Sequence, residues 1–393
     1  MFSSDDPIVI THAKRSPMGA LLGQFKDLSA SDLAGQVIAS LLQSTPSLAD
    51  TISEVYMGCV LTAGQGQAPA RQAALKGGLP LHVPATTLNK MCGSGMKAVM
   101  LGSNQLCAET QDVILAGGME SMSAAPYLLK KARSGYRLGH SALIDHLFMD
   151  GLEDAYETGK LMGIFADKTA AHLGITREQQ DAFALTSLQR SQTAIQQGYF
   201  EAEITSIQEN TLTHAQDEGP LKARPEKIKQ LKPAFSPEGT VTAANASSIS
   251  DGAAALILMR ASRAKQLGLT PLAKIVGQAS YAQEPAWFTT APVFAIQTLL
   301  KRIRWDKESV DLYEINEAFA VVTLAAIDAL GLSSQQVNIN GGACALGHPI
   351  GASGARILVT LIHALRQQDL KRGIAALCIG GGEATAIAIE RMD

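Results

Sequence analysis

A cysteine followed by small residues marks the most informative stretch of the sequence, Asn89-Lys90-Met91-Cys92-Gly93-Ser94-Gly95-Met96-Lys97-Ala98-Val99-Met100. An apolar run at helical spacing follows, which predicts that Cys92 lies at the N-terminus of a helix. Unsatisfied N–H groups and the helix dipole favour a thiolate there, and Gly93 and Gly95 would let a bulky ligand approach the backbone. Free cysteine is nevertheless more often a buried core residue. Taken alone, this stretch favours a core cysteine.

Two later stretches reverse that interpretation, NGGACALGHPIGASGAR at 340–356 and LCIGGG at 377–382. They add a histidine, a second cysteine and glycine-flanked backbone, which are the groups that acyl transfer by a cysteine nucleophile needs. His348 precedes Pro349, which favours an extended backbone and hence a loop. Cys378 and Asn316 each end an apolar run, where open α/β sheets place their sites. Singly, Cys378 could be a core thiol and Asn316 a helix cap, but together they indicate a site.

Length and composition describe an ordinary globular protein with more than one core. The chain has 393 residues, of which 46% are hydrophobic and 18% charged, so two or three domains are expected. A net charge of −3 does not indicate binding to nucleic acid or to an anionic membrane, since both attract positively charged proteins. No apolar run approaches the ~18 residues that would cross a bilayer.

Targeting signals and cysteine spacing favour a reducing compartment. The first six residues are acidic and unlike a signal peptide, and the last five are unlike a peroxisomal signal. We therefore expect a cytoplasmic protein. The cysteines are odd in number and widely spaced, which argues against disulfides and against a zinc or other metal site; they are Cys59, Cys92, Cys107, Cys344 and Cys378.

Apolar runs predict two similar α/β halves. Strands are expected at 7–11, 55–60 and 112–118, with a helix at 32–42. After about residue 246 the pattern resumes, with strands at 251–259, 272–276, 311–315 and 374–379. The order strand, glycine turn, helix, strand at 55–118 recurs at 311–379, which indicates internal duplication.

The segment between the halves has a different character. Residues 119–245 contain an amphipathic helix at 177–197 and a polar tract at 209–232, and we expect them to lie over a site. Basic residues of that tract are more often solvated than ligand-binding. The predicted domains are thus 1–118, completed by about 246–270, an inserted loop domain at 119–245, and 271–393.

These motifs together resemble the thiolase family. The resemblance covers essentially the whole chain and includes the GHPxGxSGxR run, NEAFA at 316–320, the CxGGG run and DGAAAL at 251–256. The stretch around Cys92 is most similar to the short-chain branch, the acetyl-CoA acetyltransferases. The resemblance implies the thiolase fold, in which two duplicated βαβ-type domains form αβαβα layers beneath a loop domain.

The resemblance also implies a mechanism. Cys92 would accept an acetyl group from acetyl-CoA while His348 draws off its proton. Cys378 would then remove an α-proton from a second acetyl-CoA, and water held by Asn316, together with His348, would stabilise the enolate. Backbone amides of Cys92 and Gly380 would hold the oxyanion. The product would be acetoacetyl-CoA, formed reversibly.

Coenzyme A would be a substrate, with no permanently bound cofactor. By resemblance, Ser247 would meet the pantetheine, Phe235 and Phe319 would form apolar walls, and Met162 would cover the acyl end. Arg224 would meet a coenzyme phosphate. The family's usual homodimer or homotetramer is expected, with residues 127–148 as a contact loop.

Some positions depart from the family pattern and leave the acyl specificity open. Leu161 replaces the histidine of the covering loop. Residues 287–292, WFTTAP, look closer to enzymes that also accept 2-methylacetoacetyl-CoA, so Phe288 is expected to line the acyl pocket and leave room for a branch. A 3-ketoacyl-CoA thiolase of longer chain length is the alternative within the family. A non-catalytic acyl-CoA binding protein is the alternative from another class. A dinucleotide-dependent dehydrogenase is excluded because no GxGxxG follows the first strand.

Overall fold

The computed structural model describes residues 5–43 and 45–392. Residues 1–4 and 393, on which part of the expectation about targeting signals rests, lie outside the described residues. Most predicted strands and helices are confirmed within a few residues.

One ten-stranded sheet runs through the molecule in the order β12-β13-β14-β11-β1-β10-β5-β3-β4, with β2 pairing to β10. The two halves of the sheet meet where β1 pairs with β11 through Val9–Lys274 and Ile10–Ala273. The strands are β1 (Ile8–Arg15), β2 (Gly19–Ala20), β3 (Glu54–Gly58), β4 (Ala85–Leu88), β5 (Val113–Ser121), β10 (Ser250–Arg260), β11 (Ala273–Ala282), β12 (Leu312–Ile315), β13 (Arg372–Ile379) and β14 (Glu383–Arg391).

The two halves repeat one pattern of pairing. In the first half β3 lies parallel to β5, and β5 pairs antiparallel with β10. In the second half β12 lies parallel to β13, and β13 pairs antiparallel with β14. Helix α3 (Ser94–Cys107) precedes β5, and helix α11 (Ser353–Gln367) precedes β13. The predicted duplication is therefore present, whereas the exact domain boundaries stay a prediction.

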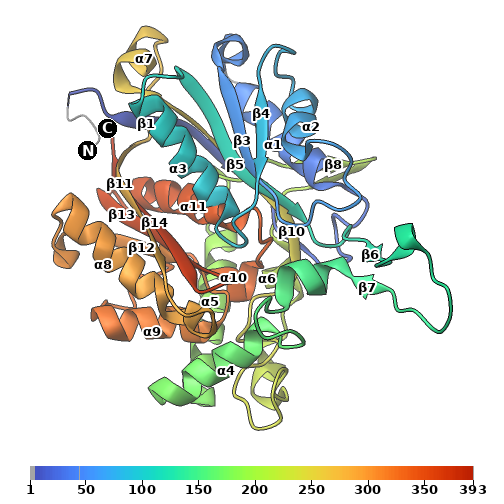
Figure 1. Ribbon diagram of the computed structural model, residues 1–393. Helices are drawn as coiled ribbons and strands as arrows, with labels where there is room; N and C mark the ends of the chain where they lie inside the picture. The colour runs from blue at the N-terminus through green and yellow to red at the C-terminus, as the bar shows by residue number, and fades with distance from the viewer. Residues whose placement is uncertain (1–4, 44, 393) are drawn as a thin grey trace.

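Helices divide the fold into five layers (Figure 1). Helices α3 and α11 share a core with one face of the strands, through residues such as Val99, Leu358 and Ile114. The opposite face of the first half packs on α1 (Ala30–Gln43) and α2 (Pro69–Lys76). The opposite face of the second half of the sheet packs on α8 (Ala291–Ile303) and α9 (Ala320–Leu330). Because neighbouring strand residues alternate between these cores, both halves of the sheet are buried on two sides, and the layers follow the order αβαβα.

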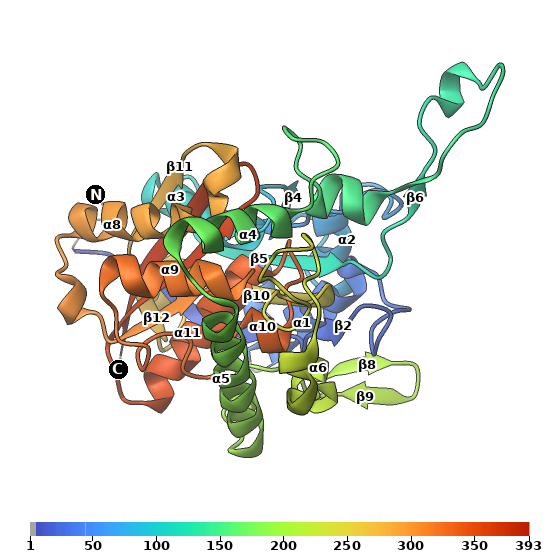
Figure 2. The ribbon, with the colours of Figure 1, turned by 90° about the horizontal axis from the view of Figure 1, so that it is seen from below.

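The segment between β5 and β10 forms a separate set of elements beside the sheet, in which α4 and α5 are the long helices (Figure 2). Its connection to the sheet includes a buried cluster in which Arg15 pairs with Glu203 at 2.5 Å and Asp217 at 2.7 Å. The elements are β6 (Tyr127–Leu128), η2 (Ala132–Ser134), β7 (Ile144–Asp145), η3 (Phe148–Leu152), α4 (Met162–Leu173), α5 (Arg177–Gln196), β8 (Ile207–Glu209), β9 (Leu212–His214), α6 (Glu218–Lys222) and η4 (Pro225–Gln230).

Shorter helices complete the described chain. They are η1 (Pro46–Thr51), α7 (Ala261–Gln266), η5 (Pro285–Thr290), η6 (Lys307–Ser309) and α10 (Ala343–Leu346). Within residues 5–43 and 45–392, none of the helices has the length and apolar character needed to cross a membrane. The same residues contain no cluster of three His, Cys, Asp or Glu side chains that could hold a metal ion.

Candidate active site

The turn that carries Cys92 is held by hydrogen bonds of Ser94. Its hydroxyl accepts from the Lys90 N–H at 2.8 Å and donates to the Met91 carbonyl at 2.6 Å. Met91 has a φ of +46°, a left-handed conformation that costs on the order of 1–3 kcal/mol. The turn therefore stores strain immediately before Cys92, whose side chain is partly exposed.

The glycines of this turn serve packing. A Cβ on Gly93 would overlap the Ile379 side chain, and one on Gly95 would lie 2.9 Å from the Ala355 nitrogen. The expectation that these glycines open a path for a ligand is therefore corrected, because both face neighbouring elements of the fold. Their role is to bring α3 close to α11 and to the end of β13.

The Cys92 thiol is neutral at pH 7. Burial raises its pKa to about 11 and the nearby Glu120 carboxylate adds to this, although the N–H groups of Gly380 and Cys92 itself oppose the shift. The expectation that the helix N-terminus yields a thiolate is thus wrong for the free protein, since desolvation of the charged form outweighs the helix. These two N–H groups therefore favour the thiolate, but less strongly than burial favours the thiol.

His348 is a buried, neutral base. Its Nδ1 lies 2.6 Å from the Ser353 hydroxyl, which donates to the Pro349 carbonyl at 2.9 Å. Since that hydroxyl has one hydrogen, Nδ1 carries the imidazole proton and Nε2 keeps a lone pair. No described residue hydrogen-bonds to Nε2. Burial, followed by the charge of Arg356, lowers the pKa of His348 to about 3.

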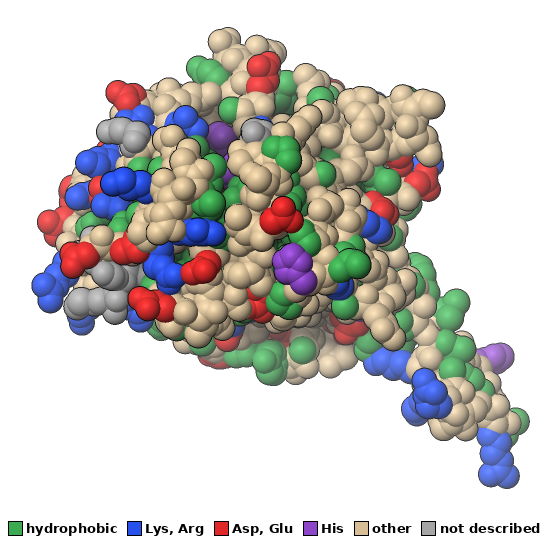
Figure 3. All heavy atoms as spheres, turned by 90° about the horizontal axis from the view of Figure 1, so that it is seen from above, with side chains coloured by type: hydrophobic (Ala, Val, Ile, Leu, Met, Phe, Trp, Pro, Cys, Tyr) green, Lys and Arg blue, Asp and Glu red, His purple; other side chains and the backbone are tan. Residues whose placement is uncertain are grey.

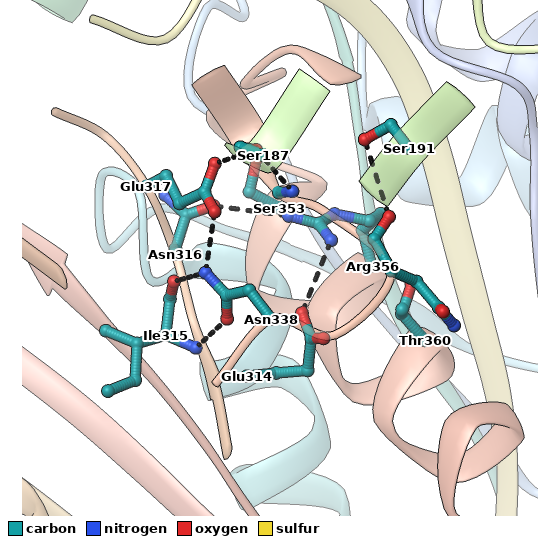
Figure 4. Close-up of polar contacts among 12 residues, drawn as sticks. Ser187, Ser191, Glu314, Ile315, Asn316, Glu317, Asn338, Ser353, Arg356 and Thr360 are labelled. Atoms are coloured by element: carbon teal, nitrogen blue, oxygen red, sulfur yellow. Dashed lines mark hydrogen bonds and ion pairs between the residues drawn. The ribbon is translucent and has the colours of Figure 1, made fainter. Parts of the chain in front are cut away.

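Asn316 joins this group from the end of β12. The residue is only 1% exposed, and its Nδ2 lies 3.5 Å from Nδ1 of His348. Its Oδ1 faces a guanidinium nitrogen of Arg356 at 3.4 Å (Figure 4). Asn316 and His348 thus lie together, as the sequence predicted.

Cys378 is buried at the end of β13 in an apolar cluster. Burial and the neighbouring Cys92 raise its pKa well above the ordinary range. The structure brings four of the predicted acyl-binding residues into the same cluster, two buried and two half-buried; they are Phe288, Phe319, Met162 and Phe235. The ring of Phe319 lies 6.0 Å from that of Phe235 and 6.4 Å from that of Phe288, centroid to centroid.

The remaining predicted residues have different placements. A Cβ on Gly380 would lie 3.6 Å from the Met162 sulfur, so the inserted segment reaches the Gly380 backbone. Ser247 is half-buried and its N–H donates to the Ala318 carbonyl at 2.9 Å, next to Phe319. Arg224 is exposed at the start of η4, and the structure does not bring it into the apolar cluster.

Glu120 is a site residue that sequence reasoning missed. Its buried carboxylate accepts from the N–H groups of Val60 at 3.0 Å, Leu61 at 3.1 Å and Gly351 at 2.9 Å. Burial raises its pKa to about 7. It therefore ties the first half to the loop after His348. An acidic residue two positions after the buried run at 112–118 was the available signal.

An ion pair also links the two halves at the site. The Lys90 ammonium, two residues before Cys92, contacts the Glu383 carboxylate at the start of β14. This contact lies across the turn that carries Gly380.

Comparisons with known proteins agree with this fold. The models of the "Thiolase, N-terminal domain" and "Thiolase, C-terminal domain" match residues 8–262 and 269–391. The chain therefore belongs to the thiolase family of acyltransferases.

Relatives with curated names match nearly end to end. The acetyl-CoA acetyltransferases of Pseudomonas aeruginosa and Cupriavidus necator are 48% and 46% identical to this chain, each covering 98% of it and 99% of the relative. The crystal structure of a Bacillus anthracis acetyl-CoA acetyltransferase superposes with a TM-score of 0.95 at 40% identity, covering 98% of this chain and 99% of that one. An Ascaris suum thiolase in complex with coenzyme A gives a TM-score of 0.93 at 40% identity, covering 98% and 100%.

The raised pKa of Cys92 predicts how the thiol reacts with pH. Because the thiolate is the nucleophile, alkylation of Cys92 by iodoacetamide should rise about tenfold per pH unit between pH 7 and 10. Peptide mass spectrometry would follow the labelling, with the exposed Cys107 as an internal reference. A rate that reaches a plateau below pH 8 would contradict the neutral thiol.

Proposed function

We propose that the protein catalyses the reversible condensation of two acetyl-CoA molecules to acetoacetyl-CoA and free coenzyme A through an acetyl-Cys92 intermediate. One observation carries the proposal: Nε2 of the buried His348 has no hydrogen-bond partner among the described residues, and the Asn316 amide lies 3.5 Å from the same imidazole ring. An apolar binding site would not need an unpartnered imidazole nitrogen beside a buried amide. This observation favours an enzyme over a non-catalytic acyl-CoA binding protein.

In the first half-reaction, Nε2 of His348 takes the Cys92 proton as the sulfur attacks the acetyl-CoA carbonyl. The thioester bond to coenzyme A breaks, and the departing thiolate recovers that proton. The step replaces one thioester by another, so its reaction free energy is small and the step is reversible. Each backbone donor at the oxyanion contributes on the order of 3 kcal/mol.

In the second half-reaction, His348 takes the Cys378 proton, and the resulting thiolate removes an α-proton from a second acetyl-CoA. The imidazolium and water held by Asn316 stabilise the enolate oxygen. The enolate carbon then attacks acetyl-Cys92, and the released Cys92 thiolate is protonated by His348.

Separate variants of the two cysteines test this division of roles. Acetyl-CoA alone should place one acetyl group on the peptide that contains Cys92, measured by mass spectrometry after an acid quench. Cys92→Ala should show none, whereas Cys378→Ala should still be acetylated yet form no acetoacetyl-CoA. Binding of acetyl-CoA by the wild type without acetylation would favour the binding protein instead.

Branched substrates are a second candidate. Phe288 packs against Phe319 within the cluster that contains Cys378, which supports its predicted position along the acyl chain. We expect comparable turnover of acetoacetyl-CoA and 2-methylacetoacetyl-CoA, measured by thiolytic cleavage, with longer 3-ketoacyl chains as the reference series. Absence of cleavage of the 2-methyl substrate would exclude this specificity.

We also propose a cytoplasmic homodimer or homotetramer whose contacts include the arm at 127–148. This arm extends from the body of the molecule and carries several Lys and Arg side chains (Figure 3). Leu138 is 97% exposed, with Leu143 at 66% and Tyr127 at 65%, and apolar side chains gathered in this way indicate a protein contact.

Replacing residues 129–143 by a short glycine-serine turn tests the contact. The mass measured by sedimentation should fall to that of a smaller assembly while acetylation of Cys92 persists. An unchanged mass would show that the arm makes no essential contact.

A further inference from the structure

A charged side chain lies directly behind Asn316 in the interior of the protein. Arg356 belongs to the second turn of α11 and is fully buried. Its Nη2 donates to Oδ1 of Asn316 at 3.4 Å, and its Nη1 lies 3.7 Å from a Glu314 carboxylate oxygen (Figure 4). Neither Nε nor Nη1 has a hydrogen-bond acceptor among the described residues. The contact with Asn316 is therefore the hydrogen bond that this guanidinium makes.

This contact determines which way the Asn316 amide faces. A guanidinium carries only donors, so the amide atom facing it must be the oxygen. The Asn316 nitrogen is then directed toward His348, 3.5 Å from Nδ1. With the amide reversed, the N–H groups of Asn316 would face the charged guanidinium. That costs more than the approach of the Asn316 nitrogen to the protonated Nδ1 of His348 at 3.5 Å, because a hydrogen bond from a charged donor is the stronger one.

The backbone around Asn316 is fixed by other residues. The Asn316 N–H donates to the Ala376 carbonyl at 3.0 Å. The amide of Asn338 accepts from the Ile315 N–H at 2.8 Å and donates to the Ile315 carbonyl at 2.8 Å. The main chain of Asn316 is thus held without Arg356, and its side-chain amide is the part left for Arg356 to orient.

We propose that Arg356 is a positioning residue that holds the Asn316 amide in one orientation, with its nitrogen on the side of His348, and thereby supports the enolate step. This inference rests on the proposed function. Arg356 acts through Asn316, so it affects the second half-reaction and not the acetylation of Cys92.

A purely structural role as the counter-ion of Glu314 explains the geometry less well. Arg356 approaches Glu314 to 3.7 Å, which is longer than its 3.4 Å contact with Asn316. Burial raises the pKa of Glu314 to about 8 despite the neighbouring guanidinium. Arg356 and Glu314 can be replaced together by neutral residues, so that neither member of the pair is left as an isolated charge.

The test uses the double variant Arg356→Met/Glu314→Gln, with Glu314→Gln alone as its reference. Condensation of acetyl-CoA should fall about 10- to 100-fold in kcat with KM little changed, because a displaced catalytic group costs rate more than binding. Exchange of labelled coenzyme A into acetyl-CoA, which requires only Cys92 acetylation, should keep its rate. Arg356→Lys, which retains the charge without the planar fork, should show the same split with a smaller loss.

Two further variants separate positioning from general damage. Thr360→Val, one turn along α11, removes a hydrogen bond to Glu203 and should leave both half-reactions unchanged. In a double-mutant cycle, Arg356→Met should add little to the condensation defect of Asn316→Ala, because the two act as one unit.

The outcomes are distinct. Equal loss of coenzyme A exchange and condensation would overturn the positioning role, as would additive effects of Arg356→Met and Asn316→Ala. Failure of the wild type to acetylate Cys92 would overturn the proposed function and this inference with it. The positioning role would be supported if Arg356→Met lowered condensation but not coenzyme A exchange, and if its effect did not add to that of Asn316→Ala.

Discussion

The close contact between the first turns of α3 and α11 is the constraint on which the site depends. A Cβ on Gly95 would lie 2.9 Å from the Ala355 nitrogen, and one on Gly354 would lie 2.5 Å from the Met96 nitrogen. Because both helices lack a side chain at this crossing, their N-termini meet at one place. The turn with Cys92 and the loop with His348 are thereby joined, and a close-packed interior holds them there.

Burial sets the protonation state of each reacting group. It raises the pKa of Cys92 and of Cys378 and lowers that of His348, so all three are neutral in the free protein. The three reacting groups therefore carry no charge before substrate arrives. Backbone N–H groups, which cannot lose their dipoles, are the fixed electrostatic element of the site.

A buried polar network fastens the inserted segment to this site. Ser187 of α5 donates to the Glu317 carboxylate at 2.7 Å, next to Asn316. The Arg15 cluster makes a second attachment through Glu203 and Asp217. Buried ion pairs add little net stability compared with apolar packing but are specific in geometry. Their effect here is to fix where the segment that carries Met162 meets the end of β13.

Local patterns in the sequence predicted much of the fold. Apolar runs predicted most long strands, because a strand buried on both faces is continuous in its hydrophobicity. They missed β14, whose Ala, Thr and Ile residues follow three glycines without a long apolar run. The motifs placed Cys92, His348, Cys378 and Asn316 at the ends of elements. A motif can do this because it contains the side chains that the reaction needs.

The sequence by itself determined the duplicated order of elements and the reacting side chains, because both are written in consecutive residues. Only the tertiary structure decided their electrostatic state and the partners behind them. The helix N-terminus predicted a Cys92 thiolate, whereas burial by distant segments leaves a thiol. Glu120 and Arg356 acquire their roles from contacts with residues far away in the chain. Desolvation and long-range hydrogen bonds depend on which segments meet, and that is a property of the folded molecule.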